Sequence, residues 1–504
     1  MSCEDQLDLQ PLGQLDENTF YQNESDFEAA SLSPYSTLLN YYYDQNGTGW
    51  MRGVLYPSDD VIPQNNVNNR EEDFNWNSDN GDFEYIWEQS YKGIGRANVI
   101  LERLPTAAGF EDEANKARFA AEARFLRAYF HFQLAKHFGT PPVVTQQFRN
   151  VEDTQLGNSQ PGEIWDAIIA DLDSARADLP PSYEEENTGR VTSGAANALL
   201  GRVYLYRAQW ENNATYYAQA IARLNDVVNS GLYSLVPNFG DNFGIATENN
   251  MESIFEIQMT RGNFNPWLAV DNASGNGAAG TGRLIFTRAG CGPNEDCAPG
   301  GNSLGYGRMH ITQGLQGAFE ENDPRRAETI YLEGDPFADT TFRAVWSVSG
   351  STPAKYVRQE DLLGRRPQPN WSGNNERIIR YADVLLMLAE AELLGNGNTG
   401  RAVELINQVR RRADPSGDIL PDRTVAGDVM MFLMQERRVE MALEGHRYND
   451  LVRWHRAGLI NIALDIDFGR APANNNWQPR HLLKPIPQRE IDLVPELRQN
   501  EGYE

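Results

Sequence analysis

Apolar residues recur at intervals of three and four positions through most of the chain, a spacing that predicts helices with one apolar face. The stripe is clearest at Ala123, Leu126, Phe130, Leu134 and Phe138. Gly139 and the prolines at 141 and 142 are expected to end that helix, because proline cannot continue one. Further helices are expected at residues 164–179, 195–208, 214–229, 380–394, 401–413, 428–443 and 448–454.

Several of these helices form pairs joined by short turns rich in glycine or asparagine, as in tetratricopeptide-like hairpins. The pairs lie far apart in the sequence, and each has to bury its apolar stripe against another. The sequence therefore predicts an all-α fold with a tetratricopeptide-like helical-hairpin scaffold, built from residues 19–237 and 373–504 of one domain that spans 19–504.

Two regions lack helical periodicity, residues 47–81 and 238–372, and both are rich in asparagine and aromatic residues. Short strand-like stretches occur at 252–259 and 341–348. Irregular segments of this length inside a compact domain are usually functional or disordered, and the aromatic content argues against disorder. Residues 238–372 are therefore expected to form a variable, loop-rich segment.

The chain is strongly acidic, with 71 Asp and Glu against 44 Lys and Arg and a formal net charge of -27. Such a field repels phosphate backbones, which argues against nucleic acid as a partner. The simplest reading of the charge is solubility. No apolar run is long enough to cross a bilayer, since even 378–394 contains Arg380, Asp383, Glu390 and Glu392.

Three cysteines bear on location. Cys3 precedes a polar, acidic stretch, as in a processed bacterial lipoprotein whose cysteine carries the lipid; the alternative is a chance cysteine in a frayed terminus. Cys291 and Cys297 enclose five residues rich in Gly, Pro and Asn. That spacing does not fit a C-x2-C zinc pair. It favours a small disulfide loop over two free thiols, and a disulfide implies an oxidising compartment.

Characteristic stretches follow one another along nearly the whole chain. They are residues 122–130 (EARFLRAYF), 138–144 (FGTPPVV), 319–325 (FEENDPR), 380–386 (RYADVLL), 389–391 (AEA), 406–410 (INQVR), 436–440 (ERRVE), 444–448 (EGHRY), 450–454 (DLVRW), 485–487 (PIP) and 499–503 (QNEGY). In this order they resemble the SusD/RagB family of outer-membrane lipoproteins of Bacteroidetes.

The resemblance implies a tetratricopeptide-like scaffold whose loops and few short strands form the ligand face. It also implies a lipid on Cys3, a tether over residues 1–18, and attachment to the outer membrane at the cell surface through that lipid alone. The implied partner is a SusC-like, TonB-dependent transporter, which the protein covers as a lid. The motifs themselves are expected to be scaffold: Arg437 and Arg438, among Glu436, Glu440 and Glu444, are spaced for ion pairs along and between helices.

Enzyme motifs find little support. The G-x-S-x-G pattern at 301–305 and the G-x-G-x-x-G pattern at 275–280 lack the strand that each requires. A surface glycosidase would need two carboxylates across a cleft, and no local motif singles out a pair. The resemblance predicts binding without catalysis and no cofactor. The alternatives are a glycosidase and the lid of a peptide-import system.

A pyranose presents an apolar face that stacks on an aromatic ring, and hydroxyl groups that amides, carboxylates and guanidinium groups bind. Tryptophans in polar loops are the candidate platforms, and Trp76 and Trp267 are the best of them because amides flank both. For Trp346 the neighbouring residues fit a buried strand as well as an exposed loop. The expected hydroxyl partners in the first loop region are Asp59, Asp60, Asn65 and Arg70.

The acidic charge favours a neutral glycan, for example a β-glucan such as laminarin, over an alginate-like or sulfated one. An exception would be a cluster of Arg70, Arg261 or Arg283 in the site. The oxygen-rich loops could also hold a structural calcium ion, although no EF-hand spacing occurs.

Overall fold

The computed structural model describes residues 20–42, 49–63, 71–259, 309–337, 340–355, 374–469 and 476–504. Its long helices confirm the mainly helical fold that the periodicity predicts. They are α1 (Glu24–Tyr42), α2 (Gly81–Arg103), α3 (Glu113–Phe138), α4 (Glu163–Asp178), α5 (Ser193–Trp210), α6 (Thr215–Asn229), α10 (Tyr381–Asn396), α11 (Thr399–Ala413), α12 (Val429–Glu440) and α13 (Arg447–Arg456).

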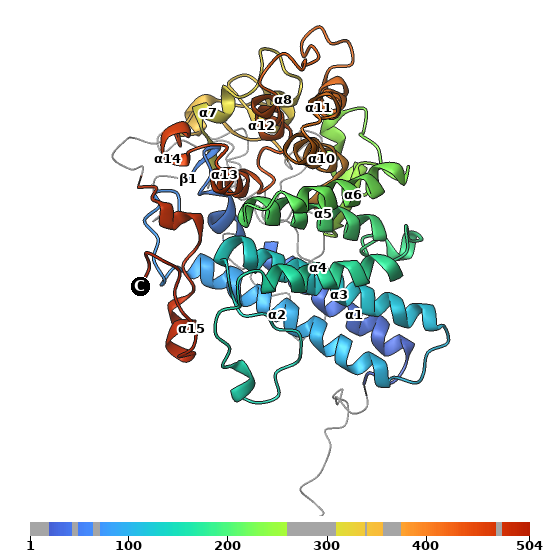
Figure 1. The fold of residues 1–504 in the computed structure, drawn as a ribbon. Helices are drawn as coiled ribbons and strands as arrows, with labels where there is room; N and C mark the ends of the chain where they lie inside the picture. Colours follow the sequence, from blue (N-terminus) through green and yellow to red (C-terminus); the bar gives the residue numbers. More distant parts are fainter. Residues whose placement is uncertain are drawn as a thin grey trace, which may run out of the picture.

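These helices stack in one continuous series (Figure 1). Each of α1 to α6 packs against the next, α6 packs against α10, and α10 packs against α11 and α12. The α6–α10 contact joins segments separated by more than a hundred residues. The prediction of a single scaffold assembled from distant segments is therefore confirmed.

Helix α3 shows why the sequence folds in this way. The Asp112 side chain accepts a hydrogen bond from the Ala114 N–H and caps the first turn. Gly139 ends the helix with a φ of 80°, a conformation that favours glycine. Where α2 crosses α3, a Cβ on Gly93 would lie 2.1 Å from the Phe130 ring. Only glycine allows the two helices to approach this closely.

The remaining elements are short. Helices α7 (Gln313–Gln316), α8 (Arg325–Thr329), α14 (Ile462–Asp465) and α15 (Gln488–Leu493) connect the larger ones. The strands are β1 (Val61–Pro63), β2 (Ser253–Ile257), β3 (Met309–Ile311), β4 (Ile330–Tyr331), β5 (Pro336–Phe337), β6 (Thr340–Thr341), β7 (Thr352–Pro353) and β8 (Glu376–Arg380). They form antiparallel pairs, β1 with β3, β2 with β8, β4 with β7, and β5 with β6.

Two local expectations are wrong. The stretch 341–348 does not form the expected strand. Strand β6 contains only Thr340 and Thr341, and Ala344–Trp346 form a 3₁₀ turn instead. Within 47–81, Met51–Leu55 form a helical turn with wide, π-type hydrogen bonding, because Met51, Val54 and Leu55 are buried in the core. No helix in the described ranges has the length and hydropathy to span a membrane.

A buried ion network holds the C-terminal helices together. Arg380, at the end of β8, donates to Glu252 and to Glu440 of α12 over 2.5 and 3.0 Å. It also donates to Glu444 over 2.8 Å, and Arg325 reaches Glu440 over 3.2 Å. All these side chains are almost completely buried. The characteristic motifs thus meet in one ionic core.

The ion pairs predicted for Arg437 and Arg438 exist, but their partners come from distant segments and not from their own helix. Arg437 contacts Asp383 of α10 and Asp450 of α13 over 2.7 and 2.6 Å. Arg438 contacts Asp59 and Asp60. These residues therefore fix the packing between elements.

Candidate functional site

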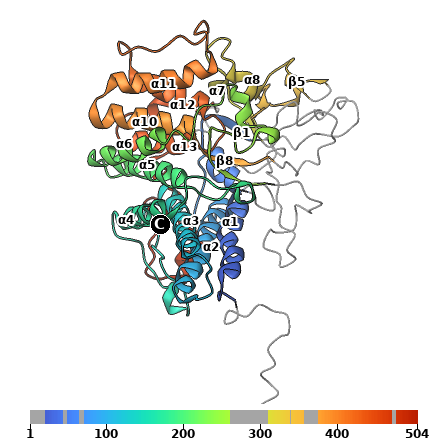
Figure 2. The same ribbon diagram turned by 90° about the vertical axis from the view of Figure 1, so that its right-hand side faces the viewer.

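The strand pairs position the described residues that border three segments which the sequence predicts as loops, and we call these bordering residues the loop roots. Pro63 at the end of β1 is paired with Met309 at the start of β3. Ile257 of β2 is paired with Glu376 of β8, and the Met259 N–H donates to the Asn375 side chain over 2.7 Å. Segments 64–70, 260–308 and 356–373 thus begin or end beside paired strands. In Figure 2, β5 and β8 lie on the side of the molecule away from α4, α6 and α11.

Phe243 anchors both ends of segment 356–373. The Asn374 amide donates to the Phe243 carbonyl over 2.6 Å. On the other side, the Lys355 ammonium lies 4.6 Å from the Phe243 ring centre and donates to Glu444 over 2.9 Å. The loop roots are therefore tied directly to the ionic core, which gives any ligand face built on them a rigid base.

A cavity of about 350 Å³ adjoins the root of segment 260–308 and mixes aromatic and polar groups, as a sugar site does. Tyr183, Tyr233, Arg190, Asn249 and Met251 are among its lining residues. The neighbouring Asn249 and Gln258 amides donate to each other over 2.9 Å. We call it the tyrosine cavity. The sequence reading missed it, because its parts come from two separated loops.

Asp59 and Asp60, predicted as hydroxyl partners, are buried ion-pair residues. Arg447 holds Asp59 through two hydrogen bonds of 2.7 and 2.8 Å, and Arg438 donates to Asp60 over 3.0 Å. Burial alone would raise the pKa of the Asp59 carboxyl, but Arg447 and Arg438 bring it below its ordinary value. Both carboxylates thus join β1 to the C-terminal helices, and the expectation that they face a ligand is wrong for this arrangement.

Trp76 is a core residue, with 1% of its surface exposed. Its ring packs edge-on against Phe83 and His481, with centroids 5.1 and 4.9 Å away. Its indole N–H donates to the Tyr503 hydroxyl. The expectation of an exposed platform is wrong here, because aromatic partners from the far end of the chain cover the ring.

Trp346 is also buried, as one of the two interpretations of its neighbours predicts, but it lies in a 3₁₀ turn and not in a strand. It packs against Phe337 and Phe342, with ring centroids 6.3 and 5.7 Å away. The expectation that it stacks on a glycan is therefore wrong for this arrangement. The other predicted positions lie outside the described residues: Trp267, Asn65 and Arg70, the lipid-anchor candidate Cys3, and the cysteine pair Cys291 and Cys297. Among the described residues, no group of three His, Cys, Asp or Glu side chains is placed to hold a metal ion.

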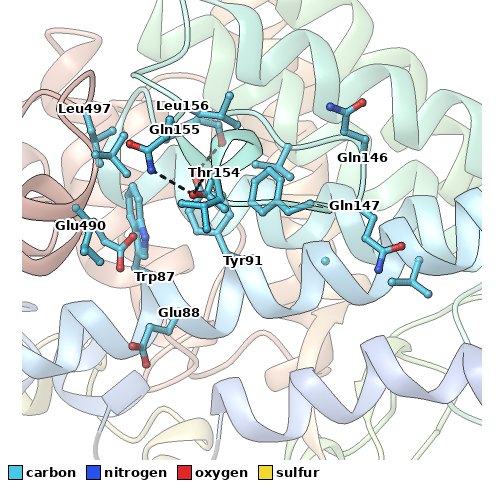
Figure 3. A pocket seen from close by; sticks show the side chains of 18 residues that line it. Trp87, Glu88, Tyr91, Gln146, Gln147, Thr154, Gln155, Leu156, Glu490 and Leu497 are labelled. Carbon is cyan, nitrogen blue, oxygen red and sulfur yellow. Dashed lines mark hydrogen bonds between the residues drawn. The ribbon is translucent and has the colours of Figure 1, made fainter. Parts of the chain in front are cut away.

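A second cavity, of about 770 Å³, forms a groove between α2, residues 142–156 and α15. Figure 3 shows the rings of Trp87 and Tyr91 on its α2 wall, with Leu497 at one end. Val151 and Leu493, which are 73% and 59% exposed, are also among its lining residues. Apolar side chains, both aliphatic and aromatic, form most of the lining. A contiguous exposed apolar surface of this kind suits another protein better than a sugar.

One carboxyl group in this groove, that of Glu490, has a raised pKa. Burial raises the pKa of Glu490; Arg489 opposes that rise and Glu88 adds to it. The Trp87 indole also donates a hydrogen bond to Glu490. Glu88 lines the groove too, but Figure 3 shows its carboxylate pointing away from the other labelled side chains. The two carboxylates therefore do not face each other across the groove, as a glycosidase pair would.

Models of known protein families match segments in both halves of the chain. Residues 307–503 match the model of the SusD family, and residues 34–205 match a family described as starch-binding and associating with the outer membrane. SusD-like protein P25 of Formosa agariphila is 27% identical, over 100% of this chain and 97% of that protein. A SusD-like protein of Bacteroides ovatus is 27% identical, over 90% and 80% of the two chains.

Solved structures agree with these matches. A structure described as a laminarin-binding SusD-like protein is 27% identical, covers 96% of this chain and 100% of its own, and has a TM-score of 0.76. A SusD superfamily protein from Bacteroides vulgatus, also 27% identical with the same coverage, has a TM-score of 0.74. None of these names describes an enzyme.

Proposed function

Since the chain belongs to the SusD family, we propose that it is a non-catalytic receptor at the cell surface that binds a polysaccharide or oligosaccharide. It passes the glycan to a SusC-like, TonB-dependent transporter for uptake. The observation that carries this proposal is the likeness, over nearly the whole chain, to a SusD-like protein that binds laminarin. A lipid on Cys3 holds the receptor at the outer membrane.

The glycan binds on the side where the loop roots lie, against Trp267 and the tyrosine cavity. Two features support this location. Trp267 belongs to segment 260–308, which leaves the scaffold after Met259, next to Gln258 and the cavity. The cavity also supplies aromatic rings and amides, the groups that a sugar requires.

A neutral glycan is the proposed ligand, with a β-glucan such as laminarin as the first to test. The net charge of -27 disfavours a polyanionic ligand through long-range repulsion. A laminarin-binding relative of the same fold supports a β-glucan.

Affinity electrophoresis of the purified full chain tests the proposal, with laminarin, other neutral polysaccharides and alginate cast in separate gels. We expect retarded migration in a neutral glycan and none in alginate. A parallel assay should find no new reducing ends after prolonged incubation. New reducing ends would establish a glycosidase instead. Binding to peptides with indifference to every glycan would point to peptide import.

Replacing Trp267 with alanine is expected to weaken glycan affinity about tenfold, because loss of one stacking platform costs about 1.4 kcal/mol. The variant should keep the unfolding temperature of the parent. Isothermal titration with an oligosaccharide of the bound glycan measures the effect, and Trp346→Phe is the matched control. An unchanged Kd in Trp267→Ala would remove this residue from the site.

A further inference from the structure

A small polar cavity lies inside the scaffold, separate from the loop face and from the apolar groove. Its volume is about 30 Å³, enough for one or two water molecules or a single small ion. Helix α3 supplies Tyr129, Gln133 and Lys136, α5 supplies Arg202, and the segment after α12 supplies His446. The space is too small for a sugar ring.

Lys136 is the unusual member of this lining. In the described part of the chain its ammonium group makes no hydrogen bond or ion pair, and its nearest aromatic contact is the Phe132 ring, 5.7 Å away. The pKa of Lys136 is lowered to about 7, first by burial and then by Arg202, while Asp450 opposes the shift. The side chain is partly buried, and a desolvated ammonium group without a partner is costly, so the site favours a partner for it.

The guanidinium and carboxylate groups around Lys136 already have partners. Arg202 is paired with Asp383, and Arg377 donates to the Asn375 carbonyl over 2.5 Å. The Glu444 carboxylate, which also lines the cavity, accepts from Arg380 and Lys355 over 2.8 and 2.9 Å. None of these contacts involves the Lys136 ammonium group.

Several hydrogen-bond donors line this space. The Gln133 carbonyl accepts from the Tyr41 hydroxyl over 3.1 Å, which leaves the Gln133 NH₂ group to donate. The hydroxyls of Tyr42 and Tyr129 bond to each other, and this bond uses only one of their two protons. Donors beside a cation that has no ion-pair partner among the described residues match the chemistry of a bound anion.

We propose that this cavity binds one small monovalent anion, such as chloride, with Lys136 as its cationic partner and Gln133 and the tyrosine pair as donors. The site goes beyond glycan binding and does not depend on it. The ion accepts hydrogen bonds from groups that have no other acceptor among the described residues, and so stabilises the packing of α3 against α5.

The pH dependence follows from the groups around Lys136. These are Arg202 on α5, Glu376 and Arg377 on β8, Glu444 and His446 after α12, Asp450 on α13, His137 on α3, Lys484, and the tyrosines. The pKa of His446 is lowered to about 4, and the pKa of Glu444 to about 2. The pKa of Asp450 is also lowered. Burial also lowers the pKa of Lys484 well below its ordinary value, and Lys136 adds to that shift. The contribution of Lys136 is therefore read from the difference between the parent and Lys136→Met, and anion binding should weaken as pH rises through the pKa of Lys136.

Thermal unfolding of the full chain tests the site, in sodium chloride or sodium gluconate at equal ionic strength. Gluconate is too large for the cavity. We expect chloride to raise Tm by about 2 °C relative to gluconate at pH 6, with a smaller difference at pH 9. In Lys136→Met this difference should vanish. In the matched control, Lys92→Met on the exposed side of α2, it should persist.

The pH dependence of folding stability in gluconate, without chloride, provides a second test. The unfolded state, with an ordinary lysine pKa near 10.5, binds more protons than the folded state between about pH 7 and that value. The parent should therefore gain stability across this interval relative to Lys136→Met. A bromide-soaked crystal should show an anomalous peak beside Lys136. Equal chloride effects in the parent and Lys136→Met, no chloride effect in the parent, or a cavity holding only water would overturn the proposal.

Discussion

Replacing Glu440 with glutamine is expected to lower the free energy of unfolding by about 3–5 kcal/mol, the usual cost of removing one partner from a buried ion pair. Glu440 accepts hydrogen bonds from Arg325, Arg380 and Arg412, and its side chain is completely buried. Glutamine keeps the shape and removes the charge. Three guanidinium groups would then share fewer carboxylates in a region that water does not reach.

Urea unfolding followed by circular dichroism measures this effect, and Glu404→Gln is the matched control. Glu404 is also paired with an arginine, Arg411, over 3.1 Å, but both side chains are 46% exposed. An exposed pair contributes at most about 1 kcal/mol. If the two variants lose the same stability, burial is not what makes the network important.

The same network explains what the sequence could predict. The ordered motifs around Arg380, Arg410, Glu436 and Glu440 are polar and charged, a composition that elsewhere would indicate a surface or an active site. Here the motifs form a buried ionic core. The family was predicted from these motifs, and the scaffold from the apolar periodicity of its helices.

The local sequence predicts side-chain exposure poorly where distant segments of the chain bury the residue. The neighbours of Trp76 are Asn75 and Asn77, so its local sequence indicates an exposed loop. The groups that cover it, His481 and Tyr503, lie more than 400 residues away along the chain. Asp59 and Asp60 were misread for the same reason, because Arg438 and Arg447 belong to another third of the protein. Periodicity predicts which face of a helix is buried, but not which irregular segments the rest of the chain covers.

The burial of Trp76 leads to the second large effect. Trp76→Ala is expected to lower the free energy of unfolding by about 3–5 kcal/mol, the typical cost of truncating a buried tryptophan. The substitution opens a cavity among Phe74, Phe83 and His481 and removes the indole N–H that Tyr503 accepts. Urea unfolding measures the loss, and Trp76→Phe, which keeps part of the ring volume, should lie between the alanine variant and the parent.

The decisive comparison pairs this variant with Trp267→Ala. Titration with glycan, below the temperature at which Trp76→Ala begins to unfold, should give the parent's Kd, because the Trp76 ring has no face open to a ligand. Trp267→Ala should show the reverse, weaker binding with the parent's stability. A loss of glycan affinity in fully folded Trp76→Ala would place the binding surface near Tyr503 and the C-terminal segment. The same two measurements therefore separate core tryptophans from ligand tryptophans, a distinction that the polar sequence around both residues conceals.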